Sequence, residues 1–126
     1  MTKRKIILIL IEAPLPFAGA ASRWYYTLCK ELYNSEYDLK IFATCASKEH
    51  SEESKKIYPT GRFYVYPKRS GIKSKLNTLI RPYSYTISKE MIDDIQKEIS
   101  LGPCVIHVEQ TFASWALKRI TPNCIL

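Results

Sequence analysis

The side chains best placed for chemistry in this 126-residue chain are His107 and Glu109, two residues apart in the segment VIHVEQ. Residues i and i+2 of a strand point to the same face of a sheet, so we expect both side chains on one face. A carboxylate at a strand end can accept hydrogen bonds from ligand hydroxyl groups, which makes Glu109 a candidate site residue. For His107 we favour the alternative, a hydrogen-bonded histidine of the core.

The segment EAPLPFAGAASR, residues 12–23, is the second candidate. Two prolines stiffen it, and Gly19 with its alanine neighbours keeps the end of the loop small. Small residues at a helix N-terminus let a phosphate approach free backbone N–H groups and the positive end of the helix dipole. The segment matches neither GxGxxG nor a P-loop, so a tight turn without a ligand remains the alternative. Ser22 is the expected N-cap of the helix that follows.

The other reactive side chains form no constellation. His50 lies in the polar segment SKEHSEESKK and is expected to be solvated. The cysteines show no CxxC pair and no metal-type spacing, which favours reduced core thiols and a cytoplasmic protein. No Ser–His–Asp order or close carboxylate pair can be assembled, so we expect neither a metal nor a resident cofactor. The cysteines are Cys29, Cys45, Cys104 and Cys124.

Positive charge is concentrated in one stretch. The chain has 19 Lys and Arg against 12 Asp and Glu, and residues 62–89 hold seven of the bases, no acid and several tyrosines. Such a stretch can contact nucleic acid phosphates, an anionic membrane leaflet or a phosphorylated substrate. The alternative is a solvated loop whose lysines lie along the surface. The candidate basic patch consists of Lys68, Arg69, Lys73, Lys75 and Arg81.

The elements that must position these residues alternate between strand and helix patterns. Strands rich in isoleucine or aromatic residues are expected at 5–11, 38–43, 62–66, 104–108 and 123–126. Helices are expected at 21–33, 82–100 and 111–119, with a polar helix or loop at 47–56 and a basic loop at 68–78. In the first helix, the spacing of Trp24, Leu28 and Leu32 predicts the buried side, and Tyr25 is a further candidate for it.

This alternation predicts a single α/β domain over residues 1–126, Rossmann-like and three-layered α/β/α, with a mostly parallel sheet of order 3-2-1-4-5. A length of 126 residues and 46% hydrophobic composition exclude a disordered tail, a coiled coil and a disulfide mini-protein. No apolar stretch approaches the roughly 20 residues that span a bilayer. The apolar run at 6–11 is shorter than the core of a signal peptide and is interpreted as a buried strand.

The order of the motifs resembles the N-terminal, acceptor-side domain of family-4 glycosyltransferases of the GT-B fold. The matching segments are APLPFAGAASRWYYTLCKEL, RPYSYTISKEMIDDIQKEI and VIHVEQTFASWALKR. The resemblance implies a metal-independent, retaining transfer of a hexose from a nucleotide-diphosphate sugar to a glycan or lipid-linked acceptor in cell-surface polysaccharide biosynthesis. It also implies a donor and acceptor cleft lined by Pro16, Gly19, Ala20, Ser22, Arg23 and Glu109.

The same resemblance implies that the enzyme needs parts outside this sequence. The family's donor-binding domain and its catalytic histidine would follow Leu126. We therefore expect a truncated chain that transfers no sugar alone, with the C-terminal donor domain, the acceptor and an anionic membrane surface as partners. The alternative is a stand-alone Rossmann-like binding module whose basic face meets nucleic acid or an anionic membrane, although nucleic acid is not favoured. A small, complete nucleotide-dependent enzyme is the third hypothesis.

Overall fold

Four parallel strands form one sheet in the computed structural model, which describes residues 4–58, 61–67 and 87–109. The strand order is β3-β2-β1-β4, so the prediction of a Rossmann-like α/β fold is confirmed for these strands. The predicted fifth strand, the helix at 111–119 and the loop at 68–78 lie outside the described residues. The strands are β1 (Lys5–Leu10), β2 (Asp38–Cys45), β3 (Phe63–Pro67) and β4 (Cys104–Val108).

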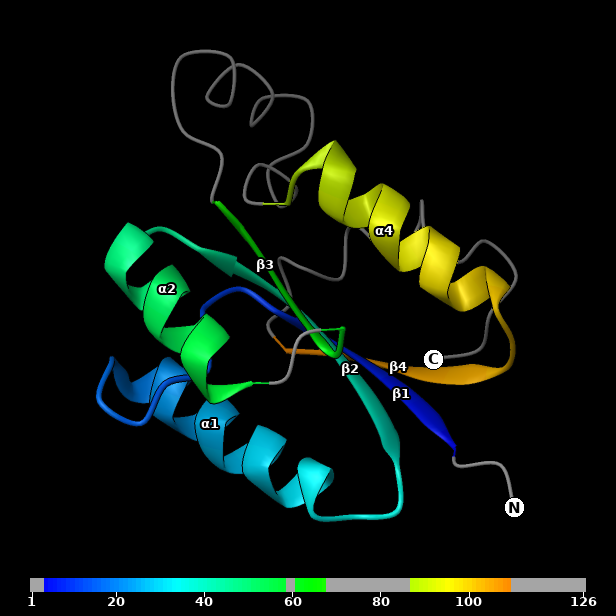
Figure 1. Ribbon diagram of the computed structural model, residues 1–126, viewed down its shortest axis with the longest axis horizontal. Helices are drawn as coiled ribbons and strands as arrows, with labels where there is room; N and C mark the ends of the chain where they lie inside the picture. The colour runs from blue at the N-terminus through cyan, green and yellow to red at the C-terminus, as the bar shows by residue number, and fades with distance from the viewer. Residues whose placement is uncertain (1–3, 59–60, 68–86, 110–126) are drawn as a thin grey trace.

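The helices cover both faces of the sheet (Figure 1). Helices α1 and α2 lie on one face, and α4 covers the other. Because α1 and α2 connect consecutive parallel strands and α4 crosses back over the sheet to β4, the right-handed crossover rule accounts for this arrangement. The bounds are α1 (Ala20–Tyr33), α2 (Lys48–Ile57) and α4 (Lys89–Ser100).

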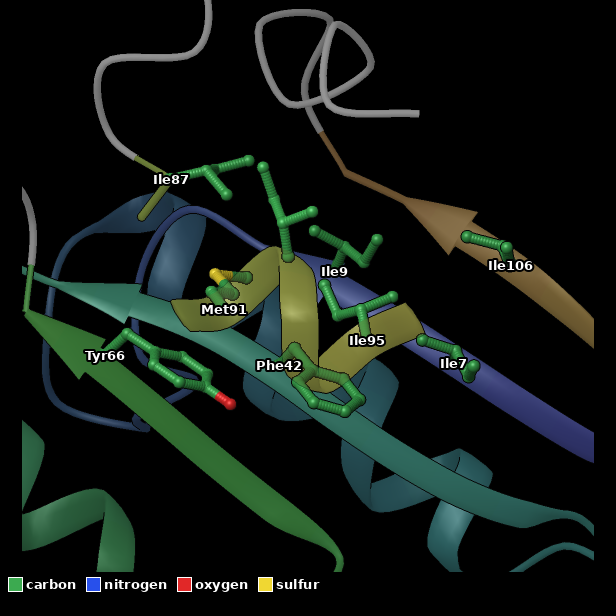
Figure 2. Packing of buried hydrophobic residues seen from close by; sticks show 9 residues of the cluster. Ile7, Ile9, Phe42, Tyr66, Ile87, Met91, Ile95 and Ile106 are labelled. Carbon is green, nitrogen blue, oxygen red and sulfur yellow. The ribbon is translucent and has the colours of Figure 1, made fainter. Parts of the chain in front are cut away.

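The alternation of side chains along the strands divides the core into two layers. In β1, Leu8 and Leu10 face α1 and α2, whereas Ile7 and Ile9 face α4, and all four are fully buried. Burial on both faces explains the continuous run of isoleucine and leucine in this central strand. On the α4 side, Met91 and Ile95 pack against the sheet, as Figure 2 shows.

The buried side of α1 differs from the prediction. The residues that face the sheet are Ser22, Tyr25 and Cys29, whereas the indole of Trp24 is 56% exposed. The buried stripe is rotated by about one residue from Trp24, or about 100° around the helix. Leu28 is only partly buried, at the border of the stripe. Spacing alone selected the larger apolar residues, but the helix packs through an aromatic ring, a thiol and a hydroxyl.

The start of helix α4 was also predicted too early. Helix α4 begins at Lys89 and not near Pro82, because the hydroxyl oxygen of Ser88 accepts the N–H of Met91 at 3.2 Å and caps the first turn. Residues 82–86 lie outside the described part. The polar segment after β2, for which a helix or a loop was expected, forms helix α2. The other predicted bounds agree with the structure to within two residues.

The thiols in the described residues are unbridged. Cys29 and Cys45 are buried as expected, and Cys104 is partly exposed. Cys124 lies outside the described residues. Within the described ranges, no helix has the length and apolar character that a membrane span requires.

Candidate functional site

A pocket of about 260 Å³ lies at the carboxyl ends of β1 and β2. In parallel α/β sheets, ligands bind at this edge, because the loops and helix N-termini there surround a crevice. The pocket is formed by the loop after β1, the first turn of α1 and the first turn of α2. Its lining residues are Glu12, Ala13, Ala18, Gly19, Ser22, Cys45, Ala46, Ser47 and His50.

A carboxylate is held inside this pocket at the start of α1. The hydroxyl of Ser22, a residue only 3% exposed, donates to Oε2 of Glu12 at 3.1 Å. This bond fixes one carboxylate oxygen beside the helix N-terminus. The positive end of a helix dipole stabilises a negative charge there. The negative charge of Glu12 therefore lies at the helix N-terminus, where a phosphate would otherwise bind, and it repels a second anion there.

Ser22 is not the N-cap of α1, contrary to the prediction. The cap is Gly19, which makes no side-chain capping bond, and its carbonyl accepts the N–H of Arg23 at 3.0 Å. Ala20 and Ala21 are strong helix formers and extend the helix past the expected start. The backbone of Gly19 has an ordinary φ of −61°, and an added Cβ would meet nothing within 4 Å. The protein's own packing thus does not require a glycine there.

The start of α2 forms the opposite wall. The hydroxyl oxygen of Ser47 accepts the N–H of His50 at 3.2 Å, which caps the helix. The thiol of Cys45 donates to the carbonyl oxygen of Ser47 at 3.1 Å and holds the turn between β2 and α2. The ring of His50 meets the ring of Phe17 edge to face, with centroids 5.9 Å apart. Phe17 is 59% exposed beside the pocket, so an apolar surface is available to a ligand there.

The loop after β1 is anchored through its backbone. The hydroxyl of Thr44 donates to the carbonyl of Ile11, and the hydroxyl of Tyr58 donates to the carbonyl of Pro14, both at 2.8 Å. Leu15, a residue of this loop, is fully buried. Burial raises the pKa of Tyr58, so its phenol stays protonated and keeps donating at neutral pH. These anchors preform the pocket wall that carries Glu12.

The structure brings only some of the predicted site residues together. Gly19 and Ser22 line the pocket, whereas Pro16, Ala20 and Arg23 are exposed and do not line it. The N–H of Glu109 donates to the carbonyl of Ile9 at 3.1 Å, which places Glu109 beside the end of β1 but outside the lining. The basic patch Lys68, Arg69, Lys73, Lys75 and Arg81 lies outside the described residues.

Four lining residues with polar or ionisable side chains were not predicted as site residues. Glu12 follows β1, Cys45 is the last residue of β2, and Ser47 and His50 follow β2. The prediction that His50 is solvated is wrong, because it is half-buried against Phe17 and the pocket. A signal was present: Ser47 is a helix-capping residue directly after a buried strand, which puts His50 in the first turn at the same sheet edge.

His107 on β4 and Glu109, which directly follows the strand, bring their side chains together as predicted: His107 Nε2 lies 2.7 Å from Glu109 Oε1. His107 is nevertheless exposed, so its assignment to the core is wrong. The reason is the edge position of β4 in the described sheet: the face carrying His107 is left uncovered there, and its neighbour Val105 is 59% exposed.

Within the described ranges, no group of three or more His, Cys, Asp or Glu residues is close enough to hold a metal ion. The pocket instead offers a carboxylate, hydroxyls, an imidazole and two helix N-termini, a set suited to hydrogen bonding with a polar ligand. Comparisons of the chain with models of protein families, with curated proteins and with solved structures find no match.

Proposed function

We propose that the chain is the acceptor-binding domain of a GT-B glycosyltransferase and that the pocket at the starts of α1 and α2 receives a sugar ring of the acceptor. The motif order shared with family-4 N-terminal domains supports the transferase class. The observation that carries the ligand class is the carboxylate of Glu12, held in the pocket by Ser22.

The lining groups match the chemistry of a hydroxylated ring. A carboxylate is an acceptor for two neighbouring hydroxyl groups, and hydrogen bonds to charged groups contribute more than neutral ones. The Ser47 hydroxyl and the His50 imidazole add further polar groups, while Phe17 offers an apolar surface for ring C–H groups. A volume of about 260 Å³ is below the range of roughly 300–1,000 Å³ for drug-sized ligands, which favours one sugar ring.

The same carboxylate disfavours a diphosphate in this pocket, because two like charges would share one partly buried site. In the proposal, the nucleotide-diphosphate sugar is held by a separate donor-binding domain, and the catalytic groups are also supplied from outside this sequence. Transfer is metal-independent and retaining, as in the family that the chain resembles. The basic residues of the stretch 62–89 support a peripheral location of the enzyme at the cytoplasmic face of an anionic membrane.

Titration of the chain with monosaccharides and with inorganic pyrophosphate, followed by backbone amide NMR, tests the ligand class. We expect saturable shifts at Gly19, Ser22 and His50 with at least one neutral sugar. Glu12→Gln removes the charged acceptor and should weaken this binding about tenfold, equivalent to roughly 1.4 kcal/mol. The same variant should strengthen pyrophosphate binding, because the repelling charge is gone.

Glu31→Gln is the matched control, since Glu31 is exposed on α1 and does not line the pocket. This variant should change neither affinity. Tighter binding of pyrophosphate than of every sugar by the original chain, with no gain in Glu12→Gln, would overturn the sugar assignment.

A further inference from the structure

A second pocket of about 260 Å³ lies between the other ends of α1 and α2. Ser22, in the first pocket, and Asn34, in the second, are twelve residues apart, or about 18 Å along the axis of a helix. The two pockets share no lining residue. The lining residues of the second pocket are Tyr26, Lys30, Tyr33, Asn34, Ile57 and Tyr58.

Tyrosine rings form a fixed wall of this pocket. The rings of Tyr33 and Tyr58 stack with centroids 5.9 Å apart and planes 23° apart. Tyr58 in turn stacks on Phe63 at 4.8 Å, and its hydroxyl is engaged by the carbonyl of Pro14. The ring of Tyr58 is therefore held on two sides, and the aromatic surface exists before any ligand binds.

One hydroxyl beside the pocket has no protein partner. The hydroxyl oxygen of Tyr33 is buried and has no hydrogen-bond partner within the described residues. Because this oxygen does not reach the pocket surface, Tyr33 contributes its ring and not its hydroxyl to the lining. Burial raises the pKa of Tyr33 to about 12.

The charges of this pocket favour a neutral ligand. Both helices end at it, and helix C-termini carry partial negative charge that disfavours an anion. Lys30, in the last turn of α1, adds a positive charge that disfavours a cation. The amide of Asn34 both donates and accepts hydrogen bonds. An uncharged ring with one apolar face and several hydroxyl groups satisfies all of these groups.

We propose that the pocket between the C-terminal ends of α1 and α2 is a second saccharide-binding subsite. The apolar C–H face of a sugar ring packs against Tyr26 and Tyr33, and its hydroxyl groups pair with Lys30 and Asn34. One glycan of several rings then spans both pockets along α1. This step rests on the proposed function, in which the first pocket binds an acceptor.

The experiment is an amide NMR titration of the chain with d-glucose, d-galactose, d-mannose and one linear hexasaccharide of each. We expect saturable shifts at Lys30 and Asn34 that persist in Glu12→Gln, because the second subsite does not use that carboxylate. Tyr26→Ala should weaken this binding about tenfold. Tyr37→Ala is the control, because Tyr37 is a tyrosine at the surface that lies outside the pocket.

Tyr33→Phe is a second control, because it keeps the ring that lines the pocket and removes only the inaccessible hydroxyl. Removing an unpaired buried hydroxyl should leave the unfolding midpoint in urea unchanged or raise it, and saccharide affinity should not change. Unchanged saccharide affinity in Tyr26→Ala would overturn the second subsite.

The outcomes for the two pockets are separable. Shifts at Gly19 and Ser22 without any at Lys30 and Asn34 would overturn the second subsite and leave the proposed function standing. The reverse pattern would overturn the proposed function and leave the second subsite standing. A hexasaccharide that bridges the pockets should bind more tightly than its monosaccharide, since linked contacts raise effective concentration. Equal affinity would overturn the bridging.

Discussion

The two faces of the sheet are built from different materials. The α4 face is packed with isoleucine and methionine around Phe42 and Tyr66, in one continuous cluster (Figure 2). The α1–α2 face mixes aliphatic residues with tyrosine, thiol and hydroxyl groups, and both pockets described above lie on this side or at its edge. If the proposed ligand sites are right, the two faces have different roles: the aliphatic face contributes stability, and the α1–α2 face carries the pockets.

The largest expected effect tests how much the α4 face contributes to the free energy of unfolding. Ile95 is fully buried on α4, so Ile95→Ala should lower the free energy of unfolding by about 3 kcal/mol, through lost burial and a residual cavity. Urea unfolding followed by circular dichroism measures it. Ile95→Val, the milder control, should cost about 1 kcal/mol. At temperatures where Ile95→Ala remains folded, its saccharide affinity should be unchanged; a loss of affinity would contradict the division between the faces.

The next prediction compares one tyrosine hydroxyl on each face. Tyr58→Phe leaves the buried carbonyl of Pro14 without its donor and should cost about 2 kcal/mol. It should also weaken binding in the first pocket, because the loop carrying Glu12 loses an anchor. Tyr66 donates to Asp94 at 2.7 Å, and Asp94 is partly solvated, so Tyr66→Phe should cost only about 1 kcal/mol. Its saccharide affinity should not change. Equal effects of Tyr58→Phe and Tyr66→Phe on saccharide affinity would show that the two faces do not differ in their influence on ligand binding.

Alkaline pH should lower the free energy of unfolding through the buried thiol of Cys29 on the α1–α2 face. Burial raises the pKa of Cys29 from its ordinary 9.0 to about 12. Because the folded pKa is the higher one, the contribution of this thiol to stability is complete below pH 9 and is lost as pH rises toward 12. At pH 10 the loss should be about 1.4 kcal/mol. The difference in unfolding free energy between the chain and Cys29→Ala, measured at pH 8 and pH 10, isolates this effect. A difference that does not change with pH would show that Cys29 is not desolvated.

The two faces also differ in how well the sequence predicts them. On α4, the residues that recur at helical spacing are aliphatic, so spacing alone selects Ile92 and Ile95, and both are buried. On α1, Trp24 and Tyr25 both have a large ring, and periodicity could not decide which one faces the sheet. Only the packing against β1 and β2 determines that Tyr25 is buried.

The sequence predicted the loop at which the candidate site lies, but not most of the residues that line it. The rule that ligands bind beyond the carboxyl ends of parallel strands located the loop with Gly19 and Ser22. Glu12 and His50 escaped notice because their roles depend on contacts between segments far apart in the sequence. His107 was misplaced for a similar reason, since burial in a strand depends on whether a helix covers that face. The local sequence pattern thus predicted the helices and strands, whereas the contacts between their side chains could be found only in the folded structure.

The smallest expected effect is the loss of a helix cap. It gives a closely matched test, because each face of the sheet is covered by a helix that a serine caps. Ser47 and Ser88 each accept an N–H three residues on, at 3.2 Å, at the starts of α2 and α4. Ser47→Ala and Ser88→Ala should therefore each cost about 1 kcal/mol of unfolding free energy. Only Ser47 lines the first pocket, so only Ser47→Ala should also reduce saccharide affinity, by about threefold. A glycine at either position restores most of the capping stability without the hydroxyl, so Ser47→Gly should recover stability but not affinity. Parallel recovery of both would mean that the Ser47 hydroxyl acts on the pocket only by holding the helix, and ligand contact would then belong to Glu12 and His50.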